Sequence, residues 1–148
     1  MKRILTLLLL STISIIGYAQ YSFSSGNPSV EMSLKRTVSQ GNDVIMDFVI
    51  TCHIEAQNIF YYDPQVYDDE GNLYTGYHPS TGNRYNYFTI DGRETGDLRL
   101  ERDIPRKMRL TVKYVDEYAS SFLLVKIPYD LNGTRYTVVI KNLPISRQ

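Results

Sequence analysis

The sequence predicts an antiparallel β-sandwich of about seven to eight strands. Apolar and polar residues alternate in a series of short segments, a pattern typical of strands that bury one face. Clusters of Gly, Pro, Asn and Asp separate these segments at spacings near a dozen residues. No stretch has a convincing helical period, and the segment 116–121 is too short to form more than a turn. A closed barrel built from the same strands is the alternative.

The first residues have the features of a secretory signal peptide. Lys2 and Arg3 precede a run that is apolar apart from scattered Ser and Thr, and Gly17-Tyr18-Ala19 matches the small-x-small pattern of a cleavage site. The apolar run is too short to cross a bilayer comfortably, and no basic stop follows it. We therefore expect export and cleavage after Ala19, to the periplasm or the exterior.

The rest of the chain reads as one domain. We expect a signal peptide at 1–19, a flexible lead-in at 20–28 and the β-sandwich at 29–148. Loss of the two basic residues of the leader leaves 14 of the 16 Lys and Arg against 16 Asp and Glu, a net charge of about −2. Such a charge gives no bulk attraction for nucleic acid or anionic lipid. The lone Cys52 cannot form an internal disulfide, so stability must come from the core.

Two long strands come first. In the segment SVEMSLKRTV, the residues expected on one face are Val30, Met32, Leu34 and Val38, with Glu31, Ser33 and Lys35 opposite. A turn at 40–43 leads into the next strand. There, one face carries Val44, Met46, Phe48, Ile50 and Cys52. Because Ile45 and Val49 make the other face partly apolar, this strand is expected to be central in its sheet.

Several turns divide the middle of the chain. Strands around 65–67 and 73–75 flank Asp68-Asp69-Glu70-Gly71-Asn72, in which Gly71 can take a positive φ, so this stretch predicts a hairpin. Further turns are expected at 79–83 and 91–92.

Three strands complete the domain. In 107–114 we expect Met108, Leu110, Val112 and Tyr114 to face the core, with Lys107, Arg109, Thr111 and Lys113 facing water. In 121–127 the expected inward set is Leu123, Val125 and Ile127. The turn Asp130-Leu131-Asn132-Gly133 then leads into a final strand over 135–141.

Three segments together suggest a family. YDDEGNLY, IPRKMRLTVKYV, and SFLLVKI with the closing VVIKNLPI resemble small secreted immunoglobulin-like domains of bacterial cell envelopes, common in Bacteroidota and mostly of unknown function. The resemblance extends from about Val30 to Ile145. It implies an immunoglobulin-like β-sandwich outside the cytoplasm, and it carries no catalytic residues.

The acidic hairpin turn is a candidate calcium site. Asp68, Asp69, Glu70 and Asn72 could supply the oxygen ligands that calcium prefers, and Asp63 could join them. The spacing does not match the EF-hand loop. Asp is also a common turn residue, because its side chain bonds to nearby backbone, so we favour a structural role and expect no metal.

A dense group of tyrosines is the candidate binding surface. Seven Tyr fall between positions 61 and 87, among Gly, Asn, Ser and Thr, a composition like that of recognition loops. The absence of Trp and the ordinary use of Tyr in strands argue for structural roles for several of them. The residues nearest the turns are the predicted ligand-binding set: Tyr74, Tyr77, Tyr85 and Tyr87.

Catalytic patterns are lacking. Cys52 and His53 are adjacent in a strand and therefore point to opposite faces, and His78 has no partner at metal-ligand spacing. No phosphate loop, nucleophile elbow or zinc motif occurs. We predict no enzyme and no cofactor, with a small hydrolase that uses an unrecognised carboxylate pair as a distant alternative.

Basic residues form one further pattern. Lys107, Arg109 and Lys113 alternate onto one strand face, following Arg99, Arg102 and Arg106. Such a stripe suits an acidic partner or a phosphate group, although it is more often a solvated face that prevents edge aggregation. The sequence as a whole predicts a non-catalytic binding or interaction module of the cell envelope, with an envelope protein or a glycan as partner. A carbohydrate-binding module that uses the tyrosine-rich hairpins is the alternative.

Overall fold

The computed structural model describes residues 21–55, 57–75, 86–90, 93–94 and 97–147. The predicted signal peptide and the turns expected at 79–83 and 91–92 lie outside these ranges. Within them the chain forms strands and turns only. No helix in the described part is long and apolar enough to cross a membrane.

The strands divide between two sheets. The seven-stranded sheet contains β1 (Ser22–Ser24), β4 (Gln57–Tyr61), β5 (Gln65–Asp68), β6 (Leu73–Tyr74), β9 (Asp97–Leu100), β11 (Ser121–Leu131) and β12 (Thr134–Pro144). The five-stranded sheet contains β2 (Val30–Gln40), β3 (Asp43–Cys52), β7 (Asn86–Ile90), β8 (Arg93–Glu94) and β10 (Arg106–Val112). The two sheets contain more strands than the seven to eight predicted, partly because β1, β6 and β8 are only two or three residues long.

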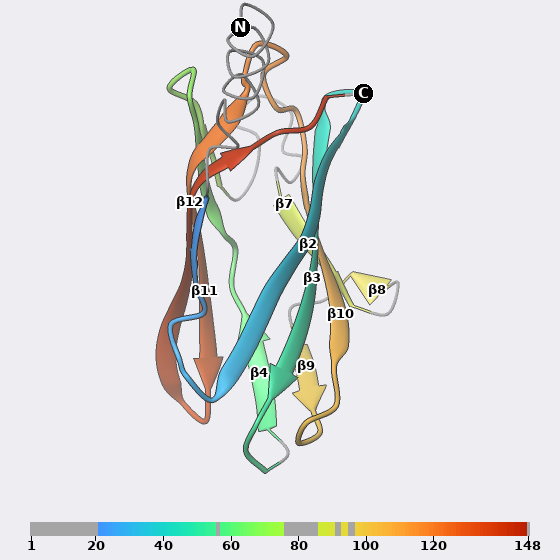
Figure 1. The fold of residues 1–148 in the computed structure, drawn as a ribbon, viewed down its shortest axis with the longest axis vertical. Helices are drawn as coiled ribbons and strands as arrows, with labels where there is room; N and C mark the ends of the chain where they lie inside the picture. The colour runs from blue at the N-terminus through green and yellow to red at the C-terminus, as the bar shows by residue number, and fades with distance from the viewer. Residues whose placement is uncertain (1–20, 56, 76–85, 91–92, 95–96, 148) are drawn as a thin grey trace, which may run out of the picture.

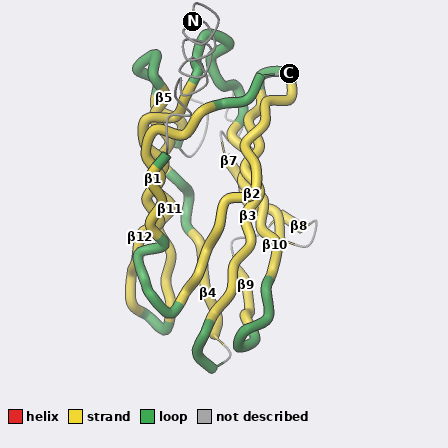
Figure 2. Tube along the Cα trace, viewed as in Figure 1, coloured by secondary structure: helices red, strands yellow, loops and turns green. Residues whose placement is uncertain are grey.

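The two sheets face each other as an antiparallel β-sandwich. Figures 1 and 2 show them as separate layers, and all strand pairs that build them are antiparallel. The five-stranded sheet has the order β2-β3-β10-β7-β8, and the other has the path β1-β12-β11-β4-β9, with β5 and β6 beside β11. The predicted fold class is therefore confirmed, and the barrel alternative does not describe the molecule.

The core lies between the sheets and follows the predicted alternation. On β3 all five expected residues are buried: Val44, Met46, Phe48, Ile50 and Cys52. β3 lies between β2 and β10, as a central strand should. The facing sheet contributes large side chains that include Phe122, Ile127, Tyr129 and Ile140. Burial of such apolar side chains contributes about 1.5–3 kcal/mol each.

A β-bulge shifts the phase of β2. Leu34 pairs with Phe48, but Arg36 pairs with Asp47, so Lys35 is an extra residue in the strand. A bulge of this kind adds local twist and re-aims the side chains that follow it. The residues after Lys35 therefore face the opposite way from the simple alternation.

The bulge overturns the prediction for Val38. This residue pairs with Ile45, which belongs to the outer face of β3, whereas Thr37 pairs with the core residue Met46. Directly opposed residues share a face. Val38 and Ile45 are buried, but neither belongs to the central core cluster. The sequence predicted that Val38 shares a face with Val30, and this prediction is wrong.

Two other predicted core residues lie at the surface. Tyr114 is 45% exposed and has a φ of 58°, which ends the alternation after β10, and Val115 takes the buried position instead. Leu123 is 48% exposed, at a register shift between β11 and β5. Its neighbour Phe122 is fully buried in its place. Both errors arise where the strand departs from regular geometry.

The structure confirms the predicted turns at 68–72 and 130–133, both as hairpin turns. β5 and β6 pair through Val66 with Tyr74 and Tyr67 with Leu73, and Gly71 has a φ of 88°. Between β11 and β12, Asn132 and Gly133 have φ values of 52° and 77°. Two successive positive φ values are typical of a two-residue type I′ turn.

The segment expected to be a flexible lead-in, 20–28, contains β1, which pairs with β12. The Tyr129 hydroxyl donates to the carbonyl of Ser25 at 2.7 Å. Gly26 has a φ of 79°, and a Cβ at this position would lie 2.5 Å from the carbonyl oxygen of Thr137. Glycine is therefore required here by both backbone conformation and close approach.

Candidate functional site

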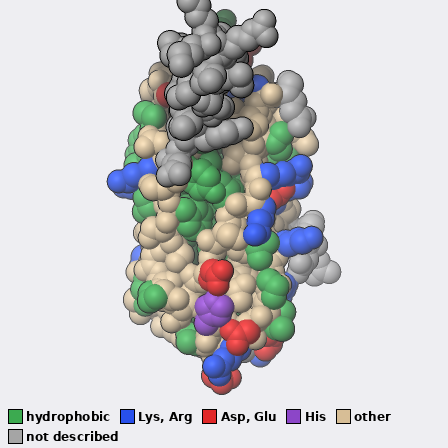
Figure 3. Space-filling model, viewed as in Figure 1, with side chains coloured by type: hydrophobic (Ala, Val, Ile, Leu, Met, Phe, Trp, Pro, Cys, Tyr) green, Lys and Arg blue, Asp and Glu red, His purple; other side chains and the backbone are tan. Residues whose placement is uncertain are grey.

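A groove lies over the outer face of the five-stranded sheet. Its volume is about 840 Å³, and residues of β2, β3 and β10 line it together with Thr89 of β7. On β3 the lining residues alternate with the core set and are Asp43, Ile45, Asp47 and Val49. Figure 3 shows basic side chains gathered on the side of the molecule along which β2, β3 and β10 run. This face is the candidate functional site.

The β2 bulge supplies two of the cations. Lys35 and Arg36 are consecutive, yet both line the groove. In a regular strand, consecutive side chains point to opposite faces. The extra residue in β2 is what places both on the outer face, and bulges often re-aim side chains at functional positions.

A carboxylate joins two guanidinium groups across the sheet. Arg36, Asp47 and Arg109 lie in one cross-strand row, with Asp47 between the other two. The Nε of Arg36 donates to Asp47 Oδ2 at 2.7 Å, and Arg109 donates to Oδ1 from Nε at 2.7 Å and to Oδ2 from Nη2 at 3.2 Å. The two-point, charge-assisted contact fixes the plane of the Arg109 guanidinium group, and the single bond through Nε anchors Arg36 beside it.

The pKa of Asp47 reflects this arrangement. Partial burial raises it, but the hydrogen bonds and positive charges of Arg109 and Arg36 outweigh burial, so the pKa lies below its usual value. Asp47 therefore stays ionised at neutral pH and holds both arginines.

The groove carries a net positive charge. Its lining has four cations and two carboxylates, a formal balance of +2: Lys35, Arg36, Lys107, Arg109, Asp43 and Asp47. Asp47 compensates Arg36 and Arg109 directly, whereas Lys35 and Lys107 form no ion pair among the described residues. The chain has equal numbers of acidic and basic residues overall, so this charge is local.

The floor between the charges is small and partly apolar. Ile45 is nearly buried and Val49 is half-buried, and no ring is among the described residues that line the groove. Thr111 pairs with Ile45 and lines the groove. It is buried, so the prediction that it faces water is wrong. An anion held here would contact aliphatic and hydroxyl groups beneath the cationic rim.

The predicted tyrosine surface is only partly described. Tyr74 is 3% exposed, and its hydroxyl donates to Asp68 at 2.7 Å, so the prediction that it lies at the surface is wrong. Burial raises the pKa of its hydroxyl. Tyr77 and Tyr85, and the side chain of Tyr87, lie outside the described residues. The backbone of Tyr87 pairs with Thr111, which places it beside the groove.

The acidic turn is held together by its own bonds. Asp68 is buried, and its Oδ1 accepts from the backbone N–H groups of Glu70 and Asn72, each at 2.9 Å. Its Oδ2 accepts from the Asn72 amide at 2.9 Å and from Tyr74. Both oxygens are thus engaged in building the turn. The described residues contain no cluster of three or more His, Cys, Asp or Glu arranged for a metal ion.

Asp69 docks this turn onto the start of β11. Its carboxylate accepts hydrogen bonds from the backbone N–H and the hydroxyl of Ser120. These bonds lower the pKa of Asp69. The side chain thus joins the hairpin to a segment far along the chain.

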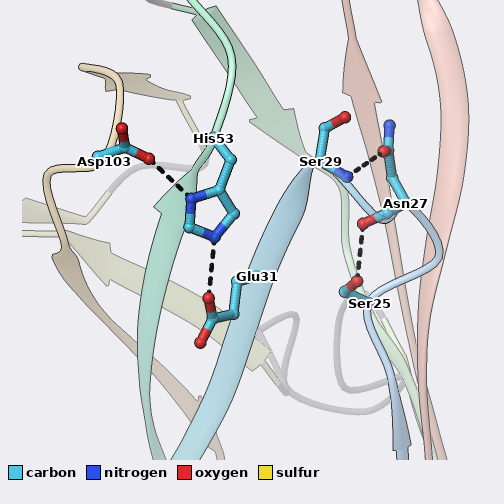
Figure 4. A network of polar contacts seen from close by, with 6 residues as sticks. All are labelled: Ser25, Asn27, Ser29, Glu31, His53 and Asp103. Carbon is cyan, nitrogen blue, oxygen red and sulfur yellow. Dashed lines mark hydrogen bonds and ion pairs between the residues drawn. The ribbon is translucent and has the colours of Figure 1, made fainter.

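Figure 4 shows a second polar cluster, around His53. Its Nδ1 lies 2.8 Å from Asp103 Oδ1 and its Nε2 lies 2.9 Å from Glu31 Oε2. The bonds to Asp103 and then Glu31 raise the pKa of His53. Cys52 is fully buried while His53 is exposed, so the prediction that these neighbours point to opposite faces is confirmed. With both nitrogens bonded to carboxylates, the ring serves as a link between three segments.

The predicted basic stripe is divided. Lys107 and Arg109 line the groove, but Lys113 does not. Outside the groove, Arg102 pairs with Glu55 and Asp103 at 3.8 and 3.6 Å. Arg99 pairs with Glu101 at 3.5 Å.

The β2 half of the site was not predicted from the sequence. Simple alternation places Lys35 opposite the core residues of its strand, and it assigns no role to Arg36 or Asp47. One signal was present: the apolar spacing of two residues up to Leu34 jumps to four before Val38. Such a jump indicates an irregularity in the strand, although it does not identify the partner of Arg36.

Comparison with known proteins adds little. No family model matches the chain, and no curated protein matches it. Among solved structures, the chain is similar to the sporulation control protein Spo0M from Bacillus subtilis, with 13% sequence identity and a TM-score of 0.39. The match covers 81% of this chain and 49% of that one, so the chain spans about half the length of Spo0M. A resemblance at this level supports no statement about function.

Proposed function

We propose that this chain is an exported, non-catalytic binding module of the bacterial cell envelope, and that the groove on the five-stranded sheet is its binding surface. The observation that carries the proposal is the bulge, which brings Lys35 and Arg36 to the same face as Lys107 and Arg109. A concave surface with one dominant charge attracts ligands of the opposite charge and sets their orientation.

The rigid position of the site supports binding. Its cations project from three hydrogen-bonded strands, and Asp47 fixes two of them. Groups held in place in advance lose less conformational freedom when a ligand binds.

The titratable side chains elsewhere support a non-catalytic role. His53 uses both ring nitrogens on carboxylates, and Cys52 is buried in the core. A general base needs a free position toward the proton that it removes, and a nucleophile needs access to its substrate. Export rests on the leader pattern of residues 1–19.

Carbohydrate binding is the second candidate. One observation favours it: the backbone of Tyr87 lies beside Thr111 at the groove, so a sugar there could meet this residue. The burial of Tyr74 weakens the carbohydrate-binding candidate, because this ring cannot contact a sugar. A glycan array that gives a hit with the wild-type chain, and none with Tyr87→Ala, would put this candidate first.

Fractionation tests the main proposal. The full chain, expressed with its leader in a bacterial host, is expected in the envelope fraction with a mass that starts at Gln20. Charge reversal by Lys35→Glu with Lys107→Glu is expected to abolish retention on isolated envelopes. The matched control, Lys126→Glu with Lys141→Glu, changes two exposed lysines of the other sheet and should retain binding. A cytoplasmic protein with an intact leader, or equal retention of both variants, would contradict the proposal.

A further inference from the structure

We infer that the groove binds an extended peptide segment of a partner protein, acidic at one end and basic at the other, lying along β3. The inference rests on the proposed function and specifies its ligand class. It follows from how the charges are distributed along and across the strands.

Cations that keep donor groups available for a ligand lie on both sides of β3. Lys35 and Arg36 belong to β2, and Lys107 belongs to β10, the two neighbours of β3 in the sheet. Neighbouring strands lie about 4.8 Å apart, so these two rims are separated by roughly 10 Å. Lys35 and Lys107 form no ion pair among the described residues, and Arg36 bonds to Asp47 through Nε, with no bond from its terminal amino groups in that part of the chain.

An extended peptide matches this spacing. Successive side chains of a strand point in opposite directions, so a peptide that lies edge-on over β3 sends them alternately toward β2 and β10. Adjacent acidic residues would then meet Arg36 on one side and Lys107 on the other. The peptide backbone would lie over Val49 and Ile45, the small aliphatic floor.

The groove also gives the peptide a direction. Its cations lie around the Asp47–Val49 part of β3, because Lys107 is opposite Val49 and Arg36 is opposite Asp47 in the sheet. At the other end, Asp43 has no ion pair among the described residues and would repel an acidic group. From Asp43 to Val49 the floor is about 20 Å long at ~3.4 Å per residue. The fitting ligand is therefore about seven residues long, acidic at one end and basic at the other.

The lining favours a peptide over a neutral glycan. Aromatic faces supply flat apolar contact area, and the described lining residues include none. A sulfated glycan or a free phosphate would bind the same cations. It would carry no positive group to pair with Asp43, the acidic residue at the other end of the groove.

Fluorescence anisotropy tests the inference. The probe is a labelled seven-residue peptide with four glutamates at one end and two lysines at the other. We expect saturable binding to the full chain after leader removal, weakened about tenfold or more by Lys35→Gln with Lys107→Gln. The matched variant Lys126→Gln with Lys141→Gln should bind as the wild type does. Asp43→Lys should reduce the preference for this peptide over one with the charges interspersed.

Three results would overturn the inference. These are no binding of the peptide up to millimolar concentration, equal binding of the interspersed peptide, or tighter binding of heparin or inorganic phosphate. If envelope retention still depends on Lys35 and Lys107 in any of these cases, the proposed function stands and only the ligand class is wrong. If retention is also independent of them, both fail.

Discussion

The Asp68 carboxylate provides the sharpest test of how the hairpin is built. It is 2% exposed and accepts four hydrogen bonds, from Glu70 N, Asn72 N, Asn72 Nδ2 and the Tyr74 hydroxyl. Asp68→Ala removes all four acceptor contacts at once. The buried Tyr74 hydroxyl then loses its hydrogen bond to Asp68, although it still accepts from the backbone N–H of Asp116 at 2.9 Å.

The expected loss follows from these contacts. Loss of the buried hydrogen bond between Tyr74 and the Asp68 carboxylate costs about 1.5–3 kcal/mol, and each of the three lost turn bonds costs about 0.5–1.5 kcal/mol. Together these give a decrease of at least about 3 kcal/mol in the free energy of unfolding. For a domain of this size the Tm should fall by at least about 10 °C.

Urea unfolding followed by circular dichroism measures this change, since the chain has no Trp. Glu70→Ala is the matched control, because Glu70 is an exposed carboxylate of the same turn with no side-chain hydrogen bond in the described structure. It should leave stability unchanged. A loss below about 0.5 kcal/mol for Asp68→Ala would refute the reasoning. A Tm of the wild type that rises with calcium would show instead that the turn is a metal site.

Three further predictions concern other parts of the fold. Because the pKa of His53 is raised, its contribution to stability is complete below pH 6.5 and is lost as pH rises through the folded-state pKa. The variant His53→Gln should therefore flatten the dependence of Tm on pH above pH 6.5. An unchanged dependence would contradict the bonds of His53 to Asp103 and Glu31. The lowered pKa of Asp47 acts in the opposite sense, because its contribution to stability is present above pH 3.8 and is lost as pH falls through the folded-state pKa. The variant Asp47→Asn should therefore lose less stability on acidification than the wild type. Equal losses in the two proteins would argue against the contacts of Asp47 with Arg36 and Arg109. Gly26→Ala should lower the free energy of unfolding by about 3 kcal/mol, because the new Cβ meets a backbone oxygen. Gly71→Ala, at a similar φ but with open space around the Cβ, should lower it by only about 1 kcal/mol. Thermal unfolding compares the two variants, and equal losses would mean that the close approach at Gly26 is unimportant.

Regular strands were predictable from the sequence because burial of one face imposes a period of two. The five core residues of β3 and the hairpin between β5 and β6 follow that rule directly. The errors at Val38, Tyr114 and Leu123 occur where a bulge, a positive φ or a register shift interrupts the period. A period-two pattern contains no information about such local departures.

The candidate site was less predictable for a different reason. Arg36 and Arg109 meet Asp47 across 11 and 62 residues of chain, and this meeting depends on the order of strands in the sheet. Alternation shows which way a side chain points but not which strand lies beside it. Tyr74 was misplaced in the same way, because its buried acceptor, Asp68, becomes apparent only when β5 and β6 pair.

The most direct test of the groove is a map of amide chemical shifts during titration with the acidic peptide. Binding at the groove predicts that the largest changes cluster at residues 35–36 of β2, 47–49 of β3 and 107–109 of β10, with the seven-stranded sheet unaffected. Changes that cluster on the hairpin at 65–74, or no changes at all at saturating peptide, would contradict the assignment of this face as the binding surface.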